Sequence, residues 1–285
     1  MSILDFAKEH GIVLGLGQRI FLKSIYGIPF DDSEKITVFD PTKIFSKEMT
    51  EKEATEFISA VGFLRKQDGV ESKTSVLNFK RRSGTTMMIC LVLGYELKRL
   101  LDMDNPQEAS RLPAHSILAA LLSCPTTYQA NMLLDNFKHI FRGYKWFLDH
   151  KDRENESSIS FKTKNDISKG VKGSIILISK SSISKKLRGH NCFFAAIDED
   201  TYHKNDKALF QAFYPSVSSF EHGKIMVVST DWLPKNEFLS SLEMQDDVCE
   251  MEAYSAFMNP NSMRSEDILM EIKRNRKGFQ LEFGY

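Results

Sequence analysis

Apolar and polar positions follow two different patterns through the middle of the chain. Short apolar runs, each long enough for one buried strand, are separated by longer segments whose apolar residues recur at helical spacing. The short runs predict buried strands at 74–79, 116–124, 174–181, 192–198 and 224–230. The longer segments predict helices at 85–101, 126–141 and 204–220, and Thr126 caps the second of them.

Strands that alternate with helices indicate an α/β fold, with a mainly parallel central β-sheet and helices on both faces. Ligands bind at the carboxyl ends of the strands in such a sheet, so we look for functional residues directly after each strand. The polar segment 150–158 predicts an exposed loop. The chain from 248 onward, with a predicted helix at 265–277, is interpreted as a closing appendage.

The composition is that of a folded protein with an uneven charge distribution. The chain has 285 residues, of which 42% are hydrophobic, and this is enough for a sizeable core. Lys+Arg and Asp+Glu both number 38, so net charge gives no reason to expect nucleic acid binding. Residues 162–190, however, contain eight Lys or Arg and one acid, and 236–253 contain six acids and no Lys or Arg. The alternatives are a basic surface that meets a polyanion, or solvated loops of opposite sign.

The cysteines and the N-terminus exclude several classes of protein. Cys90, Cys124, Cys192 and Cys249 lack the spacing of zinc ligands or of a dense disulfide framework, so we expect reduced thiols. The N-terminus has charges where a signal peptide needs an apolar core, and no apolar run approaches the length of a membrane span. We therefore expect a cytoplasmic protein without a membrane partner.

The segment NFKRRSGTTMM, residues 78–88, places a glycine turn between a strand and a helix. Such a turn aims backbone N–H groups and the helix dipole at one point, which favours a phosphate group. A P-loop pattern would use Gly84 as its second glycine and Thr86 as its Mg²⁺-binding hydroxyl. Phe79 and Thr85 replace its first glycine and its lysine. The alternative is that Gly84 merely breaks a strand before a helix capped by Thr85.

Further candidate residues follow other strands. CFFAAIDED ends a buried run with Asp198 and Glu199, and adjacent carboxylates there are costly unless they face a cation or solvent. This is the Walker B arrangement, although a plain exit from the strand is the alternative. VVSTD (227–231) could sense a γ-phosphate, and Gln18 could present a donor and an acceptor to adenine. Each of these signals is weak by itself.

The motifs GQRIFLKSIYG, KRRSGTT, KKLRGH, FFAAIDED, VVSTD and AYSAFMNP occur in this order. In that order the chain resembles the ATPase domain of the large terminase subunit of tailed bacteriophages, a DNA-packaging motor. The resemblance implies a P-loop NTPase core of the ASCE/RecA-like type at 1–255, with a small lid-like segment at 256–285. That segment would lead to a nuclease domain, which we expect to be absent, so no DNA cleavage is expected from these residues.

The resemblance also implies activity, partners and location. It implies an ATPase, dependent on DNA, that drives double-stranded DNA into a procapsid with Mg²⁺ as cofactor. The implied partners are a portal protein, a small terminase subunit and further copies of the chain in a ring, in the cytoplasm of an infected bacterial host. The implied nucleotide-binding residues are Gln18, which contacts adenine, and Lys80, Arg81, Arg82, Ser83, Gly84, Thr85 and Thr86.

Roles in catalysis and coupling follow from the same resemblance. Thr86 and Asp198 would hold Mg²⁺, and Glu199 would activate the attacking water. Arg81 would stabilise the γ-phosphoryl charge within the subunit, and Arg188 would do so in a neighbouring subunit unless it is only a salt-bridged surface residue. Ser229 and Thr230 would couple hydrolysis to movement. The residues expected to grip DNA phosphates are Lys162, Lys164, Lys169 and Lys172.

Thr85 is the main departure from the family pattern, because threonine cannot supply the charge of the P-loop lysine. Lys80, Arg81 or Arg82 could replace that charge, and we favour this account. Alternatively, Thr85 is an introduced substitution, or the site binds nucleotide poorly. Two rival functions stay open, a helicase-like ATPase and a catalytically silent module that docks on a partner.

Overall fold

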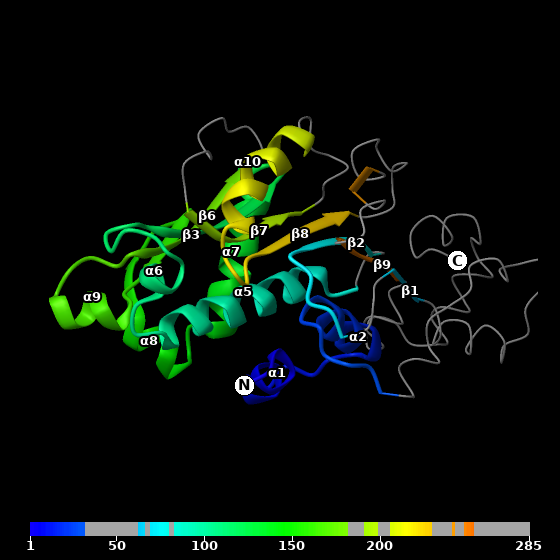
Figure 1. The fold of residues 1–285 in the computed structure, drawn as a ribbon, viewed down its shortest axis with the longest axis horizontal. Coiled ribbons are helices and arrows are strands. Elements are labelled where there is room, and N and C mark those ends of the chain that lie inside the picture. The colour runs from blue at the N-terminus through cyan, green and yellow to red at the C-terminus, as the bar shows by residue number, and fades with distance from the viewer. Residues whose placement is uncertain are drawn as a thin grey trace, which may run out of the picture. The chain divides into compact units, whose positions relative to one another are not determined.

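The computed structural model describes the backbone of residues 1–31, 62–65, 69–79, 83–181, 191–198, 206–229, 241–242 and 248–253. The chain divides into two compact units, which are described separately. Unit 1 consists of Met1–Thr85 and Val228–Tyr285, and unit 2 consists of Thr86–Val227. Figure 1 shows the elements of both units. Within the described ranges, none of the helices has the length and apolar character needed to cross a membrane.

The described part of unit 1 includes helices α1 and α2 and a small group of strands. The strands lie in the order β1-β9-β2, with β9 parallel to β2 and antiparallel to β1. Every residue of β2 is buried, which explains its uninterrupted apolar and small-polar sequence TSVLNF. The elements of unit 1 are α1 (Ile3–Glu9), α2 (Leu16–Ile25), β1 (Gly62–Arg65), β2 (Thr74–Phe79) and β9 (Val248–Ala253).

Unit 2 contains most of the sheet. Its strands lie in the order β8-β7-β3-β6-β5-β4; β8, β7, β3 and β6 are parallel, and the hairpin β5-β4 is antiparallel. The elements are α5 (Thr85–Asp102), α6 (Pro106–Ala109), β3 (Leu118–Cys124), α7 (Thr127–Phe141), α8 (Lys145–His150), β4 (Lys151–Glu154), β5 (Ser158–Phe161), α9 (Lys164–Lys169), β6 (Ile175–Ser181), β7 (Asn191–Ile197), α10 (Asp206–Ser218) and β8 (Lys224–Ser229).

Helices cover both faces of the strands in unit 2. Helix α7 packs against β3 and β6, and α10 packs against β7. Figure 1 shows α10 on one side of these strands and α5 on the other. The thiol of Cys90 on α5 donates to the carbonyl of Leu133 on α7 at 3.8 Å, which joins these two helices. The predicted α/β class with a mainly parallel, two-sided sheet is therefore confirmed.

The predicted central strands and helices are confirmed within a few residues at each end. The exposed loop predicted at 150–158 is wrong, because β4 occupies 151–154 and forms a hairpin with β5. The strand β9 lies in the region interpreted as an appendage, and it pairs with β2 along six residues. The predicted helix at 265–277 and the predicted lid at 256–285 lie outside the described residues. The division at residue 255 stays a prediction.

A glycine in α5 allows the closest approach of an aromatic side chain in the core of unit 2. A Cβ atom built on Gly94 would lie 2.5 Å from Cζ of Phe141. Phe141 is fully buried, and its ring lies 5.2 Å from that of Phe137 and 5.6 Å from that of Trp146, measured between ring centroids. The ring therefore has little room to move away, and close packing at this point requires glycine.

We predict that Gly94→Ala destabilises the protein although alanine is the better helix former. The gain in helix propensity is about 1 kcal/mol. The overpacking penalty against Phe141 is about 2–3 kcal/mol, so the expected net loss is about 1–2 kcal/mol. Urea unfolding followed by circular dichroism measures the difference. Gly143→Ala is the matched control, because a Cβ atom there would meet no atom within 4 Å.

Candidate functional site

Gly84, directly before α5, has a backbone conformation that suits a tight turn at the start of a helix. Gly84 has a φ of 81°, a left-handed conformation that costs a residue with a side chain free energy and that glycine adopts readily. Thr85 begins α5, a helix of 18 residues, so the first free N–H groups and the positive end of the dipole lie at this turn. Ser83 is buried immediately before it. The turn can therefore receive a phosphate group through backbone donors.

Three of the predicted loop cations, Lys80, Arg81 and Arg82, lie outside the described residues. The same is true of Glu199, Arg188 and Thr230. Their predicted roles therefore stay predictions. The described members of the predicted site are Gln18, Ser83, Gly84, Thr85, Thr86, Asp198 and Ser229.

Gln18 connects the N-terminal helix pair to the loop within unit 1. Its side-chain Nε2 donates to the carbonyl of Ser83 at 3.1 Å, and its Oε1 accepts from the backbone N–H of Gly15 at 3.0 Å. The side chain is only 3% exposed. One donor and one acceptor of the amide are thus already used to hold the loop against α2. The sequence prediction assigned the same donor and acceptor to adenine, and that assignment stays a prediction.

Asp198 lies directly after β7 in unit 2, and its backbone N–H donates to the carbonyl of Ser123 on β3 at 2.8 Å. Burial raises the pKa of the Cys90 thiol, and the negative charge of Asp198 raises this pKa further. The carboxylate is therefore within electrostatic reach of Cys90 on α5. Cys90 follows Thr86 by one helical turn, so the two residues share a face of α5.

Thr86 and Asp198 together offer oxygen ligands from two elements of one unit. Hydroxyl and carboxylate oxygens suit Mg²⁺, which usually completes its shell with phosphate oxygens and water. No cluster of three or more His, Cys, Asp or Glu side chains that could hold a metal ion occurs in the described part of the chain.

Ser123 lies near the carboxyl end of β3, and its carbonyl accepts from the backbone N–H of Asp198. The sequence analysis did not select it. Its side chain is buried, and its Oγ has no hydrogen-bond partner among the described residues. Ser123 pairs with Ile197 in register, one residue before Asp198. The signal in the sequence was a hydroxyl at the end of the apolar run 116–124. Ser229 is likewise buried at the end of β8, at the position predicted for coupling.

The four lysines predicted to grip DNA differ in their surroundings. Lys162 lies 3.5 Å from Asp152 and Lys164 lies 3.1 Å from Asp104, in each case between Nζ and a carboxylate oxygen. The pKa of Asp152 is below its usual range because the backbone N–H of Gly173 donates to it and because Lys162 is near. These two lysines are therefore partly neutralised.

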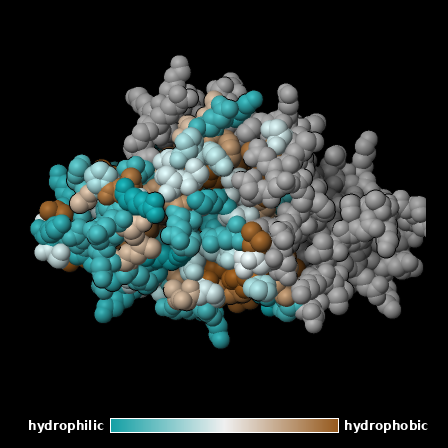
Figure 2. Space-filling model, in the orientation of Figure 1, coloured by the Kyte–Doolittle hydropathy of each residue, from teal (hydrophilic) through white to brown (hydrophobic). Residues whose placement is uncertain are grey.

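Lys169 and Lys172 are exposed and have no ion pair among the described residues. They precede β6, whereas Asp198 follows β7, which runs parallel to β6 with β3 between them. The two lysines therefore lie at the amino ends of the strands, opposite Asp198. Figure 2 shows a mostly hydrophilic surface over α8 and α9.

Comparison with known proteins places the chain in a family. A family model described as "Uncharacterized protein MJ0330, N-terminal P-loop domain" matches residues 41–284. A search among curated proteins finds no match.

Among solved structures, the ATPase domain of the large terminase of Thermus phage P74-26 is similar with a TM-score of 0.53 and 15% identity, covering 75% of this chain and 88% of that chain. A mutant of that domain gives a TM-score of 0.55 and 16% identity, covering 75% and 89%. The large terminase of a thermophilic bacteriophage gives 0.50 and 12% identity, covering 77% of this chain and 49% of that chain. This chain thus shares the fold of terminase ATPase domains, as the sequence predicted.

We predict that Gln18→Leu lowers the free energy of unfolding by about 1–3 kcal/mol, because it leaves the Gly15 N–H and the Ser83 carbonyl without their partner. Leucine has a similar size, so little of the loss comes from packing. Chemical denaturation measures it. Arg19→Ala, at the neighbouring exposed position, is the control and is expected to change stability little. An unchanged midpoint for Gln18→Leu would contradict the anchoring role.

Proposed function

The chain belongs to the family of P-loop domains whose model matches residues 41–284, and we propose that it is the ATP-hydrolysing motor domain of a viral large terminase. In this proposal the domain converts ATP and water to ADP and phosphate. The free energy released drives double-stranded DNA into a procapsid. The shared fold with terminase ATPase domains supports the proposal, and the residues of the site supply the chemical argument.

One observation carries the proposal. Helix α5 starts directly after the left-handed turn at Gly84 and carries Thr86 in its first turn, and Asp198 directly follows the buried strand β7. A phosphate held by the turn would therefore have a hydroxyl and a carboxylate available for its metal ion. If Gly84 only ended a strand, there would be no reason to expect an acidic residue such as Asp198 directly after β7. The combination favours a nucleotide site over a structural turn.

Each residue of this site has a separate proposed role in hydrolysis. The loop holds the phosphates through its N–H groups, and Gln18 fixes the loop. Thr86 and Asp198 would hold Mg²⁺, which when bound neutralises charge on the β and γ phosphates. Glu199, the next residue in the sequence, would accept a proton from the attacking water.

The missing lysine is replaced, in our proposal, by a cation of the KRR segment. Thr85 occupies the first position of α5, where its backbone N–H still serves the loop. Lys80, Arg81 and Arg82 directly follow β2 and are close in sequence to the turn. A guanidinium can contact two phosphate oxygens at once, so an arginine is a competent substitute. Arg188 is proposed to act on the site of a neighbouring subunit in a ring.

DNA is proposed to contact the exposed lysines Lys169 and Lys172 through its phosphates. Such contacts carry no sequence information, as a translocating motor requires. A portal protein and a small terminase subunit are the proposed protein partners, in the cytoplasm of an infected host. Ser229 and Thr230 are proposed to transmit the state of the nucleotide.

A second candidate function follows from Thr85 alone. A P-loop without its lysine loses a charge-assisted contact to the β and γ phosphates, which is worth about two or more decades in rate. If no other cation replaces it, the domain is a docking module without catalysis. The two candidates differ in whether phosphate is released.

We predict that the protein releases phosphate from ATP and that duplex DNA accelerates this release. Glu199→Ala is expected to reduce the rate by roughly 100-fold or more, because the water loses its general base. Asp200→Ala is the matched control and is expected to retain activity. A coupled assay of phosphate release with and without DNA measures these rates.

Thr85→Lys separates the two candidate functions. If a cation of the KRR segment already replaces the lysine, Thr85→Lys is expected to change the rate by less than about tenfold, and Arg81→Ala in the unaltered chain to abolish release. Release that starts only in Thr85→Lys would show that the natural loop lacks a functional cation. The absence of release in every variant would support the docking module.

We predict that Lys169→Ala combined with Lys172→Ala weakens binding to duplex DNA at every sequence and lowers the slope of log affinity against log salt by about 1 per lost phosphate contact. Lys164→Ala is the control, because this lysine already pairs with Asp104. Fluorescence anisotropy over a range of salt concentrations measures both. An equal effect of the control and the double variant would remove the assignment of this surface.

A further inference from the structure

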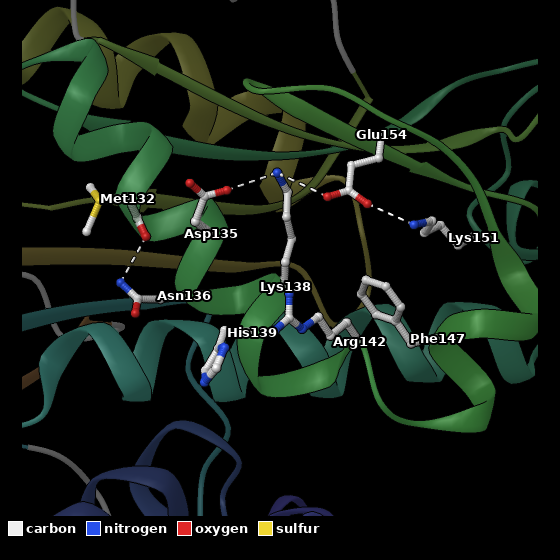
Figure 3. A pocket seen from close by; sticks show the side chains of 9 residues that line it. All are labelled: Met132, Asp135, Asn136, Lys138, His139, Arg142, Phe147, Lys151 and Glu154. Atoms are coloured by element: carbon white, nitrogen blue, oxygen red, sulfur yellow. Dashed lines mark hydrogen bonds and ion pairs between the residues drawn. The ribbon is translucent and has the colours of Figure 1, made fainter.

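A cavity of about 530 Å³ lies between α7 and β4 in unit 2, in a place to which none of the motifs assigns a role. Figure 3 shows the side chains around it, which come from α7, from the start of α8 and from β4. This volume is in the range of pockets that hold small ligands. The lining residues are Met132, Asp135, Asn136, Lys138, His139, Arg142, Phe147, Lys151 and Glu154.

The two carboxylates of the cavity are neutralised by lysines. Nζ of Lys138 lies 3.0 Å from Asp135 and 3.5 Å from Glu154, measured to carboxylate oxygens. Nζ of Lys151 donates to the other oxygen of Glu154 at 2.8 Å. The hydrogen bond from Lys151 also lowers the pKa of Glu154, followed by the nearby charge of Lys138. Figure 3 shows Lys138 extended between the two acids, so these four charges form a closed group.

Arg142 and His139 are the cavity residues left over by this pairing. Neither side chain has an ion pair or hydrogen bond among the described residues, and both residues are exposed. They are separated by three positions at the end of α7, so their side chains lie on the same part of the helix surface. Counting Lys138, Arg142 and Lys151 against the two carboxylates gives the cavity one uncompensated positive charge with His139 neutral.

We propose that this cavity binds a small ligand that carries a phosphate or carboxylate group, with Arg142 as the principal contact and His139 as the second donor. A guanidinium presents a planar fork that matches two oxygens of such an anion. Asn136, whose Nδ2 donates to the carbonyl of Met132, and the apolar side chains of Met132 and Phe147 complete the lining. The ligand is thus an organic anion of small-metabolite size, held at one charged end.

The site is separate from the proposed nucleotide site, and it does not depend on the proposed function. Asp198 follows β7, and β4 is the fourth strand beyond β7 in the order β7-β3-β6-β5-β4. Neighbouring strands are spaced by roughly 4.8 Å, so β4 and β7 are on the order of 19 Å apart. Helix α7 starts after the carboxyl end of β3 and runs back, which carries Arg142 away from the end where Asp198 lies.

Trp146 makes the proposal testable at the cavity itself. Its ring centroid lies 5.9 Å from that of Phe147, which lines the cavity, and the chain has only two tryptophans, Trp146 and Trp232. In a Trp232→Phe background, the fluorescence of Trp146 reports ligands here and not at the Gly84 turn. Inorganic pyrophosphate and citrate are the probes for the two anion types. We expect saturable quenching or enhancement by at least one of them.

Arg142→Ala is expected to weaken this binding by roughly tenfold or more, because a charge-assisted contact is lost. His139→Ala should weaken it less. Lys145→Ala, which removes an exposed cation that does not line the cavity, is the matched control and should bind as the parent does. Circular dichroism confirms that each variant folds.

Three results would overturn the proposal. The first is no saturable response of Trp146 to either anion. The second is equal affinity in Arg142→Ala and in its parent, and the third is an equal loss in Lys145→Ala, which would indicate general attraction of anions. In each case Arg142 would only complement the dipole at the end of α7, and its substitution would lower stability alone. Failure here would leave phosphate release unchanged, so the motor proposal is tested separately.

Discussion

The candidate site depends on one backbone constraint, the left-handed turn at Gly84. A fully buried strand ends at Phe79, and a long, largely buried helix begins at Thr85. Gly84 precedes this helix with a φ of 81°, a conformation that glycine adopts without strain. The same turn leaves the first N–H groups of α5 unsatisfied by the helix. Close packing and anion binding are therefore two consequences of one turn.

A second constraint decides where Asp198 lies. The pairing of β3 with β7 shifts between Ala119 and Ala120, so Phe193 is an extra residue in β7. One extra residue moves all later side chains to the opposite face relative to the residues before it. The face presented by Asp198 is therefore set by a bulge five residues earlier. Because every residue from 192 to 197 is apolar and buried, no alternation in the sequence could reveal this bulge.

The elements that could be predicted from the sequence are those with a clear apolar pattern. Strands buried on both faces, such as β3 and β6, and helices such as α5 and α7 carry continuous or periodic apolar patterns, so they were predicted nearly to their ends. The hairpin β4-β5 was missed because β4 is an exposed edge strand with the charged sequence KDRE. The candidate residues of the loop and of the end of β7 were selected by residue type, and their chemistry stays a prediction. The use of the Gln18 amide to hold Ser83 depends on a contact across 65 positions, which no local pattern encodes.

The predicted basic surface shows the same limit, because charges that are close in space can be far apart in the sequence. The excess of cations at 162–190 counts neighbours in sequence, whereas Coulomb interactions depend on distance in space. Lys162 and Lys164 meet Asp152 and Asp104, which lie earlier in the chain, and the basic surface is reduced accordingly. Lys169 and Lys172 lie at the amino ends of the strands, whereas Lys180 lies near the carboxyl end of β6 and Asp198 directly follows β7. In the proposed motor, a change at the nucleotide would have to be transmitted along or around the buried strands of unit 2 to reach Lys169 and Lys172. Tightly packed strands move as rigid bodies, so the transmission would be a displacement of elements rather than a gradual deformation.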